Sequence, residues 1–197
     1  MSKKIIFATS NEGKMKEIRM MLEDLDYEII SLKEAGINID IVEDGNTFEE
    51  NALIKAKTIM AITNEIVMAD DSGLEIDAFD KKPGIHSSRF LGEDTSYDVK
   101  NQYILDKLKD VKWDDRTARF VCSIACVFPE GRIITKQGVM EGHIAYKIEG
   151  ENGFGYDPIF WLQEYNSTSA KLTLVEKNKE SHRGKALLAL KEELSNV

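Results

Sequence analysis

The segment IVMADDSG, residues 66–73, brings two acidic residues together at the end of an apolar run. Asp70 and Asp71 repel each other when both are ionised, and acidic side chains are rarely buried without a partner. The pair therefore either begins an ordinary polar turn or holds a cation that makes the closeness favourable. Acidic residues are also concentrated in IVEDGNTFEEN, residues 41–51. Carboxylates from two segments, completed by phosphates and water, suit Mg²⁺, so metal-assisted phosphoryl chemistry is one hypothesis.

The segment TSNEGK, residues 9–14, lies between an expected strand and an expected helix. Its small and hydroxyl-bearing residues leave backbone N–H groups accessible, and Lys14 adds a positive charge where the helix dipole is already positive. The segment is not a P-loop, because Ala8 and Met15 stand where that motif needs Gly and then Ser or Thr. A solvated helix start and a phosphate-binding site are both open interpretations of this loop.

Basic residues crowd the segment SHRGK, residues 181–185, where a C-terminal helix is expected to begin. The helix dipole favours acidic residues in a first turn, yet His182, Arg183 and Lys185 stand there. Local rules are often broken at functional sites, so this cluster favours a bound anion such as phosphate. Lys177, just upstream, adds to the positive charge.

The segment GFGYDP, residues 153–158, lacks the third glycine of a dinucleotide fingerprint, because that position is Pro158. One interpretation is a tight turn in which Phe154 and Tyr156 are core aromatics. The other is a loop that presents one of these rings for stacking on a nucleobase. The segment alone fits both interpretations equally well.

Hydrophobic periodicity predicts the elements that position these segments. Apolar runs predict strands at residues 3–8, 27–31 and 66–69, and helical spacing predicts helices over 12–25, 48–62, 97–109 and 181–194. Thr47 and Glu50 form a capping-box pattern at the start of the second helix. The residues of helix 97–109 expected to face the core are Val99, Tyr103, Ile104 and Leu108. Segments 117–128 and 132–145 flank PEG and predict a hairpin. Together these elements indicate an α/β fold with a mixed sheet and a ligand at the carboxyl ends of its strands.

The composition is that of a globular protein, with 197 residues of which 42% are hydrophobic and 31% charged, enough for one domain or at most two lobes. The net charge of −9 argues against a nucleic-acid-binding surface, which would carry a basic excess. No apolar run approaches the length of a membrane span, so no membrane association is expected. Cys122 and Cys126 share one face of a predicted strand and match no zinc or redox motif. We therefore expect buried free thiols in a reducing cytoplasm.

Six segments, taken in order, resemble the inosine triphosphate pyrophosphatase family. They are TSNEGK at 9–14, TFEENA at 47–52, ADDSG at 69–73, PGIHSSRF at 83–90, GFGYDPIF at 153–160 and SHRGKAL at 181–187. Each segment is weak alone, but the ordered set is specific and spans nearly the whole chain. The resemblance implies one domain over residues 1–197, an α/β fold with a mixed sheet and two lobes around a central nucleotide-binding cleft, and a homodimer.

The resemblance also implies an activity and its residues. The family hydrolyses noncanonical purine nucleoside triphosphates (ITP, dITP and XTP) to the monophosphate and pyrophosphate with Mg²⁺. Carried over by motif, Asp71 is the catalytic acid, Glu43 and Asp71 are the metal ligands, and Asp44 is a rival ligand. Physical reasoning alone does not rank Asp71 above Asp70 as the group that activates water. The positions that match substrate-binding residues are Thr9, Ser10, Asn11, Glu12, Gly13, Lys14, Ser72, Phe154, Gly155, Tyr156, Asp157, Lys177, His182 and Arg183.

Two other functions compete with this one. A nucleotide-sensing module would need the phosphate and base segments but not the acidic pair, so Asp70 and Asp71 argue against it. A pyrophosphatase for modified pyrimidine nucleotides, or a phosphatase that releases inorganic phosphate, would use the same kinds of residue. The products formed from different nucleotides separate these alternatives.

Overall fold

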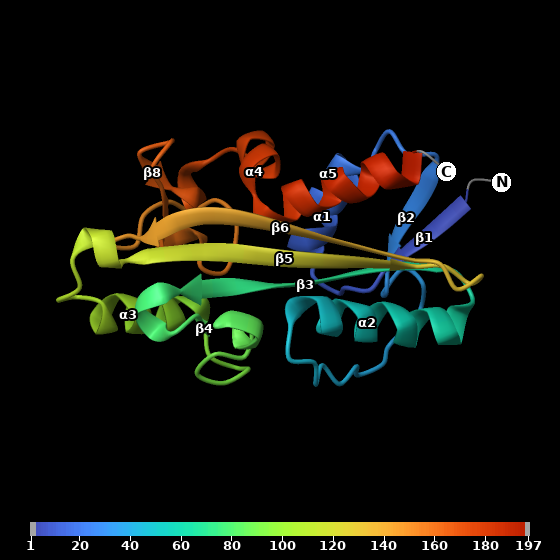
Figure 1. Ribbon diagram of the computed structural model, residues 1–197, viewed down its shortest axis with the longest axis horizontal. Coiled ribbons are helices and arrows are strands. Elements are labelled where there is room, and N and C mark those ends of the chain that lie inside the picture. The colour runs from blue at the N-terminus through green and yellow to red at the C-terminus, as the bar shows by residue number, and fades with distance from the viewer. Residues whose placement is uncertain (1–2, 196–197) are drawn as a thin grey trace. The chain divides into compact units, whose positions relative to one another are not determined.

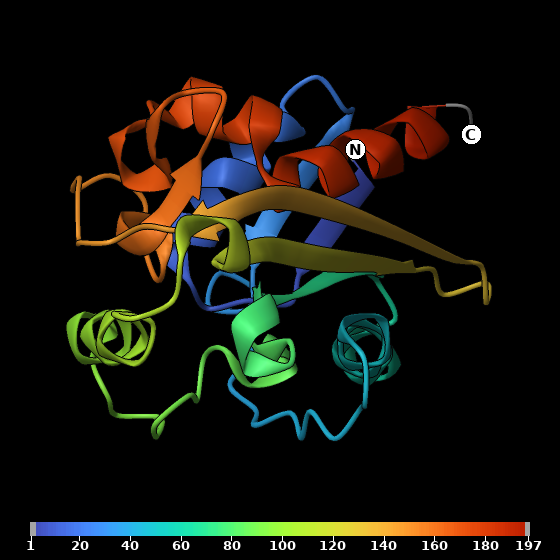
Figure 2. The same cartoon turned by 60° about the vertical axis from the view of Figure 1, so that its left-hand side comes forward.

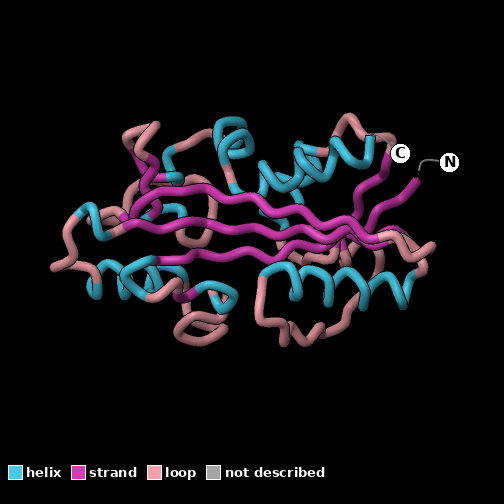
Figure 3. Tube along the Cα trace, viewed as in Figure 1, coloured by secondary structure: helices cyan, strands magenta, loops and turns pink. Residues whose placement is uncertain are grey.

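The computed structural model describes residues 3–195, which form a mixed sheet and five α-helices (Figure 1; Figure 3). The strands are β1 (Lys3–Phe7), β2 (Tyr27–Ser31), β3 (Ile66–Ile76), β4 (Lys82–Pro83), β5 (Thr117–Val127), β6 (Ile133–Ile144), β7 (Phe160–Leu162) and β8 (Ser167–Thr168). The helices are α1 (Glu12–Met21), α2 (Phe48–Thr63), α3 (Tyr97–Lys107), α4 (Leu174–Glu180) and α5 (His182–Ser195). Within this part of the chain, no helix is both long and apolar enough to cross a membrane.

The strand order is β2-β1-β3-β5-β6-β7-β8, and β4 pairs with β3. Strand β1 is parallel to both β2 and β3, whereas β7 is antiparallel to β6 and β8. Parallel and antiparallel pairs in one sheet confirm the predicted mixed α/β class. The described chain divides into two compact units. The first unit comprises residues 3–71, 122–138 and 182–195, and the second comprises residues 72–121 and 139–181.

In the first unit, helices cover both faces of the strands. Helix α2 lies on one face, and α1 and α5 lie on the other (Figures 1 and 2). The core under α1 and α5 includes Phe7, Ile18, Met68, Ile124 and Leu187. The core under α2 includes Ile6, Ala56, Val67, Ala69 and Val127. Burial on both faces explains why the strands appear in the sequence as continuous apolar runs rather than alternating patterns.

Strand β3 is longer than predicted. The sequence predicts a strand over 66–69 that ends at the acidic pair, but β3 continues to Ile76. Asp70 is 1% exposed and Asp71 is 8% exposed, so the alternative of an ordinary polar turn is wrong. The strand continues because fully buried apolar residues, Leu74 and Ile76, resume beyond the acids and pack into the core of the second unit.

Both α1 and α2 begin with a capping side chain, and Thr47 is the cap that the sequence predicts for α2. Asn11 caps α1, since its side-chain oxygen accepts a hydrogen bond from the Lys14 backbone N–H at 3.0 Å. Thr47 caps α2 in the same way by accepting from the Glu50 N–H at 3.1 Å. The Glu50 carboxylate in turn accepts from the backbone N–H of Asn46, one residue earlier than a regular capping box requires.

In the second unit, α3 forms as predicted but turns a different face inward. Val99 is 55% exposed and Tyr103 is 39% exposed, whereas Lys100 and Asn101 are buried. The two buried polar side chains donate hydrogen bonds to backbone carbonyls, Lys100 Nζ at 2.7 Å and Asn101 Nδ2 to Gly155 at 3.1 Å. The predicted inner face was therefore wrong in part, because backbone acceptors allow polar side chains to occupy core positions.

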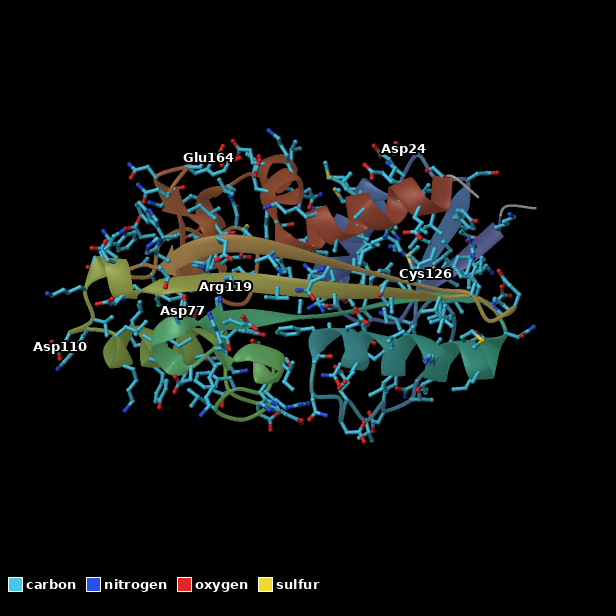
Figure 4. All side chains as sticks on the ribbon, viewed as in Figure 1. Asp24, Asp77, Asp110, Arg119, Cys126 and Glu164 are labelled. Atoms are coloured by element: carbon cyan, nitrogen blue, oxygen red, sulfur yellow. The ribbon has the colours of Figure 1, made fainter. Side chains whose placement is uncertain are left out.

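The predicted hairpin is confirmed as β5 and β6. Cys122 and Cys126 are buried free thiols on the same side of β5, as expected, and Cys126 is labelled in Figure 4. Burial raises the pKa of each thiol to about 12, so both stay protonated. In the second unit, Figure 4 also labels Asp77 and Arg119, whose side chains form an ion pair at 3.4 Å.

The beginning of α5 packs closely against strand β6 at Gly138. A Cβ atom added at this position would lie 2.0 Å from the His182 carbonyl oxygen and 2.8 Å from the Ala186 backbone nitrogen. Both contacts are with the backbone, which cannot rotate away as a flexible side chain can. Only glycine therefore allows this approach of strand and helix.

We predict that Gly138→Ala lowers the free energy of unfolding by about 1–3 kcal/mol, because overpacking displaces the first turn of α5. Chemical denaturation measures the change. Lys136→Ala is the control in the same strand; it removes only a surface ion pair and should change stability by no more than about 0.5 kcal/mol. Equal stabilities for wild type and Gly138→Ala would show that the helix start adjusts freely.

Candidate functional site

Asp70 and Asp71 occupy successive positions in the middle of β3. Side chains at successive strand positions point to opposite faces, so one carboxylate faces α1 and α5 and the other faces α2. The contacts follow this division. Asp70 binds Lys14 of α1 and Arg183 of α5, while Asp71 contacts Asn51 and Lys55, which both belong to α2.

The Asp70 carboxylate lies between two cations. Lys14 Nζ donates to both of its oxygens at 3.0 and 3.1 Å, and the Arg183 guanidinium donates to Oδ2 at 3.1 and 3.3 Å. Arg183 also donates to the buried carboxylate of Glu17 at 2.7 Å. Burial alone would raise the pKa of Asp70, but Lys14, Arg183 and Lys55 outweigh burial and hold this pKa well below its ordinary value. Asp70 is therefore an ionised partner for these cations.

The Asp71 carboxylate has a different environment. Its Oδ2 accepts a hydrogen bond from Asn51 Nδ2 at 3.1 Å, and its Oδ1 lies 3.7 Å from Lys55 Nζ. The Asn51 amide is oriented by the Gly45 N–H, which donates to Asn51 Oδ1 at 2.9 Å. Burial raises the pKa of Asp71, and the nearby charges of Glu43 and Asp70 act in the same direction against Lys55 and Asn51. Of the two acids, Asp71 is the one more ready to accept a proton.

The Lys55 ammonium group contacts both Glu43 and Asp71. It donates a hydrogen bond to Glu43 Oε2 at 2.9 Å and lies 3.7 Å from Asp71 Oδ1. Burial would lower the pKa of Lys55, but Asp70, Asp71 and Glu43 together raise it, so the amine stays charged. Asp44, the rival of Glu43 in the sequence, is exposed.

The donor set fits a magnesium ion that also binds phosphates. Among residues 3–195, no group of three or more His, Cys, Asp or Glu side chains is arranged to hold a metal alone. Mg²⁺ in nucleotide enzymes needs only one or two carboxylates, since phosphates and water complete its octahedron. Glu43 and Asp71 supply that number, and both already face a cation.

The segment Thr9–Lys14 links β1 to α1 in the first unit. Thr9 Oγ1 accepts a hydrogen bond from the Asn11 N–H at 3.2 Å, and the helix begins at Glu12. Ser10 to Gly13 are exposed, whereas Lys14 is partly covered. Part of the positive charge at the start of α5 is neutralised within the protein, because the Arg183 guanidinium binds two carboxylates.

In the second unit, Asp157 organises the GFGYDP turn. Its Oδ2 accepts from Lys177 Nζ at 2.7 Å and from the Phe154 N–H at 2.9 Å, and its Oδ1 accepts from Ser169 Oγ at 2.9 Å. Gly153 has φ of 78°, and a Cβ atom there would lie 2.2 Å from Asp157 Oδ2. The glycine is thus required by both backbone conformation and space.

The two aromatic residues of this turn have different environments. Tyr156 is a core residue whose hydroxyl donates to the Ser87 carbonyl at 2.7 Å and whose ring meets the Tyr97 ring edge-on at 5.2 Å. Phe154 is 36% exposed, and Lys177 Nζ lies 4.6 Å from the centre of its ring. Of the two rings, Tyr156 therefore fits the core interpretation, and Phe154 is the one with the exposure that the stacking interpretation requires.

The remaining expected residues are placed as follows. His182 begins α5 in the first unit and is buried, and Ser72 belongs to the second unit, directly after Asp71. The sequence reasoning missed Glu17, Asn51 and Lys55. One signal was available, because Asn51 and Lys55 are four residues apart on the helix face that also carries the buried Ala52.

Comparisons with known proteins agree with this description. The model of the Ham1 family matches residues 5–193. A dITP/XTP pyrophosphatase of Clostridium perfringens is 46% identical over 201 residues, covering 99% of this chain and 98% of that protein. One from Exiguobacterium sibiricum is 47% identical, covering 98% of this chain and 97% of that protein.

Solved structures show the same fold. A HAM1 protein from Coxiella burnetii superimposes with a TM-score of 0.90 at 39% identity, covering 99% of this chain and 100% of that chain. The Ham1 protein of Staphylococcus aureus superimposes with a TM-score of 0.89 at 38% identity, covering 98% of this chain and 99% of that chain. These matches confirm the family resemblance that the ordered motifs indicate, and the chain belongs to the Ham1 family.

Proposed function

We propose that this protein hydrolyses ITP, dITP and XTP to the nucleoside monophosphate and pyrophosphate in a Mg²⁺-dependent reaction. Relatives that match nearly the whole chain are named dITP/XTP pyrophosphatases, which supports the substrate class. The observation that carries the proposal is the Asp71 carboxylate, which is buried, accepts a hydrogen bond from Asn51 and shares Lys55 with Glu43. Two carboxylates thus meet at one positive charge, as a site for metal-assisted hydrolysis requires.

The contrast between the two acids supports Asp71 as the general base. Asp70 is held ionised by Lys14 and Arg183, so it has little tendency to take up a proton. In the proposed reaction Asp71 orients a water molecule and accepts its proton as the oxygen attacks the α-phosphorus. The bond from that phosphorus to the bridging oxygen breaks, and pyrophosphate leaves. Lys14 offsets the negative charge that develops on the leaving group.

Glu43 and Asp71 are the residues that would hold Mg²⁺. The bound ion supplies one piece of chemistry, the withdrawal of charge from the phosphate oxygens. Glu43 is favoured over Asp44 because its carboxylate already shares a cation with Asp71.

The motif correspondence assigns the nucleotide contacts. Residues 9–14 match the segment that holds the triphosphate, and Ser72 matches a position beside the substrate. Phe154 to Asp157, Lys177, His182 and Arg183 match positions that hold the nucleotide and its base. Hypoxanthine and xanthine carry a 6-oxo acceptor where adenine has a 6-amino donor. A donor placed at that edge would face a second donor in ATP, at a cost of about 1–3 kcal/mol for an unpaired buried group.

We also propose that the protein is a cytoplasmic homodimer. The family resemblance supports the dimer, and the two buried, protonated thiols suit a reducing compartment. Light scattering of the purified protein tests the oligomeric state.

We predict that the protein with Mg²⁺ releases pyrophosphate from ITP, dITP and XTP, and much less from ATP or dTTP. Chromatography of the products and separate assays for pyrophosphate and phosphate measure the outcome. A sensing module would bind ITP without any product. Release of inorganic phosphate, or equal cleavage of ATP, would contradict the proposal.

We predict that Asp71→Asn lowers kcat by about 100-fold or more, because the variant loses its general base. Its melting temperature should stay close to that of wild type, since asparagine is isosteric and adjoins Asn51 and Lys55. Steady-state kinetics with ITP and thermal melting measure both properties. A near-normal turnover in Asp71→Asn would remove Asp71 from its proposed role.

We predict that Asp70→Asn acts mainly on stability, lowering the free energy of unfolding by about 3–5 kcal/mol because Lys14 and Arg183 lose a buried counter-charge. The effect should depend on pH. The folded-state pKa of Asp70 lies below its ordinary value of 3.8, so the ionised form stabilises the protein above that pH and this contribution is lost as the pH falls below it.

Urea denaturation at several pH values tests this directly. The stability difference between wild type and Asp70→Asn should stay constant from about pH 7 to about pH 5 and should shrink as the pH is lowered below about 4. A difference that does not shrink below about pH 4 would mean that Asp70 is not the depressed carboxylate.

A further inference from the structure

Lys55 places its ammonium group beside both of the proposed metal ligands, Glu43 and Asp71. Its ammonium group lies 2.9 Å from Glu43 Oε2 and 3.7 Å from Asp71 Oδ1. The Lys55 side chain is 12% exposed and that of Asp71 is also 12% exposed, so water screens this pair only weakly. The contact therefore has a substantial electrostatic effect.

The lysine is held in this place by its own helix. Lys55 lies one turn after Asn51 on α2, and Asn51 donates to the other oxygen of Asp71. Both Asp71 oxygens thus face α2, one towards an amide and one towards a cation. Glu43 comes from the loop before α2 and completes the group.

A single positive charge and a divalent cation compete for the same two carboxylates. A cation that binds Glu43 and Asp71 must share them with Lys55 or displace it, and like charges at close range repel. Polyphosphate changes this balance, because its oxygens offer the displaced ammonium group a new partner.

We propose that Lys55 is a built-in counter-cation that keeps divalent metal affinity low in the nucleotide-free protein and couples metal binding to binding of the triphosphate. The inference rests on the proposed function, since it takes Glu43 and Asp71 as the metal ligands. Coupling of this kind is reciprocal, so Mg²⁺ must strengthen nucleotide binding by the factor by which the nucleotide strengthens Mg²⁺ binding.

Calorimetric titration of the nucleotide-free protein with MgCl₂ tests the first part. Lys55→Met keeps the length of the side chain without its charge and should bind Mg²⁺ about tenfold more tightly than wild type. Lys57→Met is the matched control, because it removes the same charge from an exposed position of the same helix; it should change the affinity by less than about twofold. Lys55→Arg, which keeps the charge, should bind Mg²⁺ as weakly as wild type.

The α,β-imido analogue of ITP, which cannot be cleaved at the scissile position, tests the coupling. Mg²⁺ should strengthen its binding to wild type by a larger factor than its binding to Lys55→Met. Thermal melting without nucleotide checks the fold, and Mg²⁺ should raise the melting temperature of Lys55→Met more than that of wild type. If Lys55→Met does not fold, Lys55→Gln removes the same charge while keeping a hydrogen-bond donor near Glu43.

The outcomes separate this inference from the proposed function. If Lys55→Met binds Mg²⁺ no more tightly than wild type, while wild type still releases pyrophosphate from ITP with Mg²⁺, the inference is wrong and the function stands. An unchanged coupling factor in the uncharged variants also overturns it. If wild type neither binds Mg²⁺ nor cleaves ITP, both fail.

Discussion

Two buried carboxylates at adjacent positions of β3 set the main constraint on the first unit. Strand geometry turns Asp70 and Asp71 to opposite faces, so one cation cannot serve both equally. Each face therefore needs its own positive charge, and the elements that cover the faces supply it. Helices α1 and α5 bring Lys14 and Arg183 to Asp70, and α2 brings Lys55 to Asp71. The repulsion that makes IVMADDSG unusual is resolved by the two-sided covering of the strand.

The same arrangement gives two identical side chains opposite chemical properties. Two cations at hydrogen-bond distance stabilise the charged form of Asp70 more than burial disfavours it. Asp71 has one more distant ammonium group and a neutral amide, so burial dominates and its pKa rises. A proton-accepting group and a counter-ion that is charged at neutral pH thus arise from a difference in surroundings alone, as is common where acid and base roles are divided between carboxylates.

The sequence predicts those features that depend on nearby residues and misses those that depend on distant ones. The cap at Thr47, the β5–β6 hairpin and the C-terminal helix α5 follow from short-range patterns and are confirmed. The length of β3 is missed because charged residues interrupt its apolar run, and the partners that permit their burial lie far away in the chain. The choice between Asp70 and Asp71 is of the same kind, since Arg183 is 113 residues from Asp70. Lys55 is missed because its role follows from its contacts with Glu43 and Asp71, which the sequence pattern does not reveal.

Every cation that the structure places at Asp70 or Asp71 already has a carboxylate partner. Lys14 and Arg183 share Asp70, Arg183 also binds Glu17, and Lys55 shares Glu43 and Asp71. In a chain with a net charge of −9, a polyphosphate can bind such a site only by exchanging with these internal carboxylates or by arriving with its own cation. Precise placement of the internal partners then matters as much as their charge. Gly138 contributes to this placement. The first turn of α5, which carries Arg183, lies against Gly138 so closely that a methyl group would not fit there.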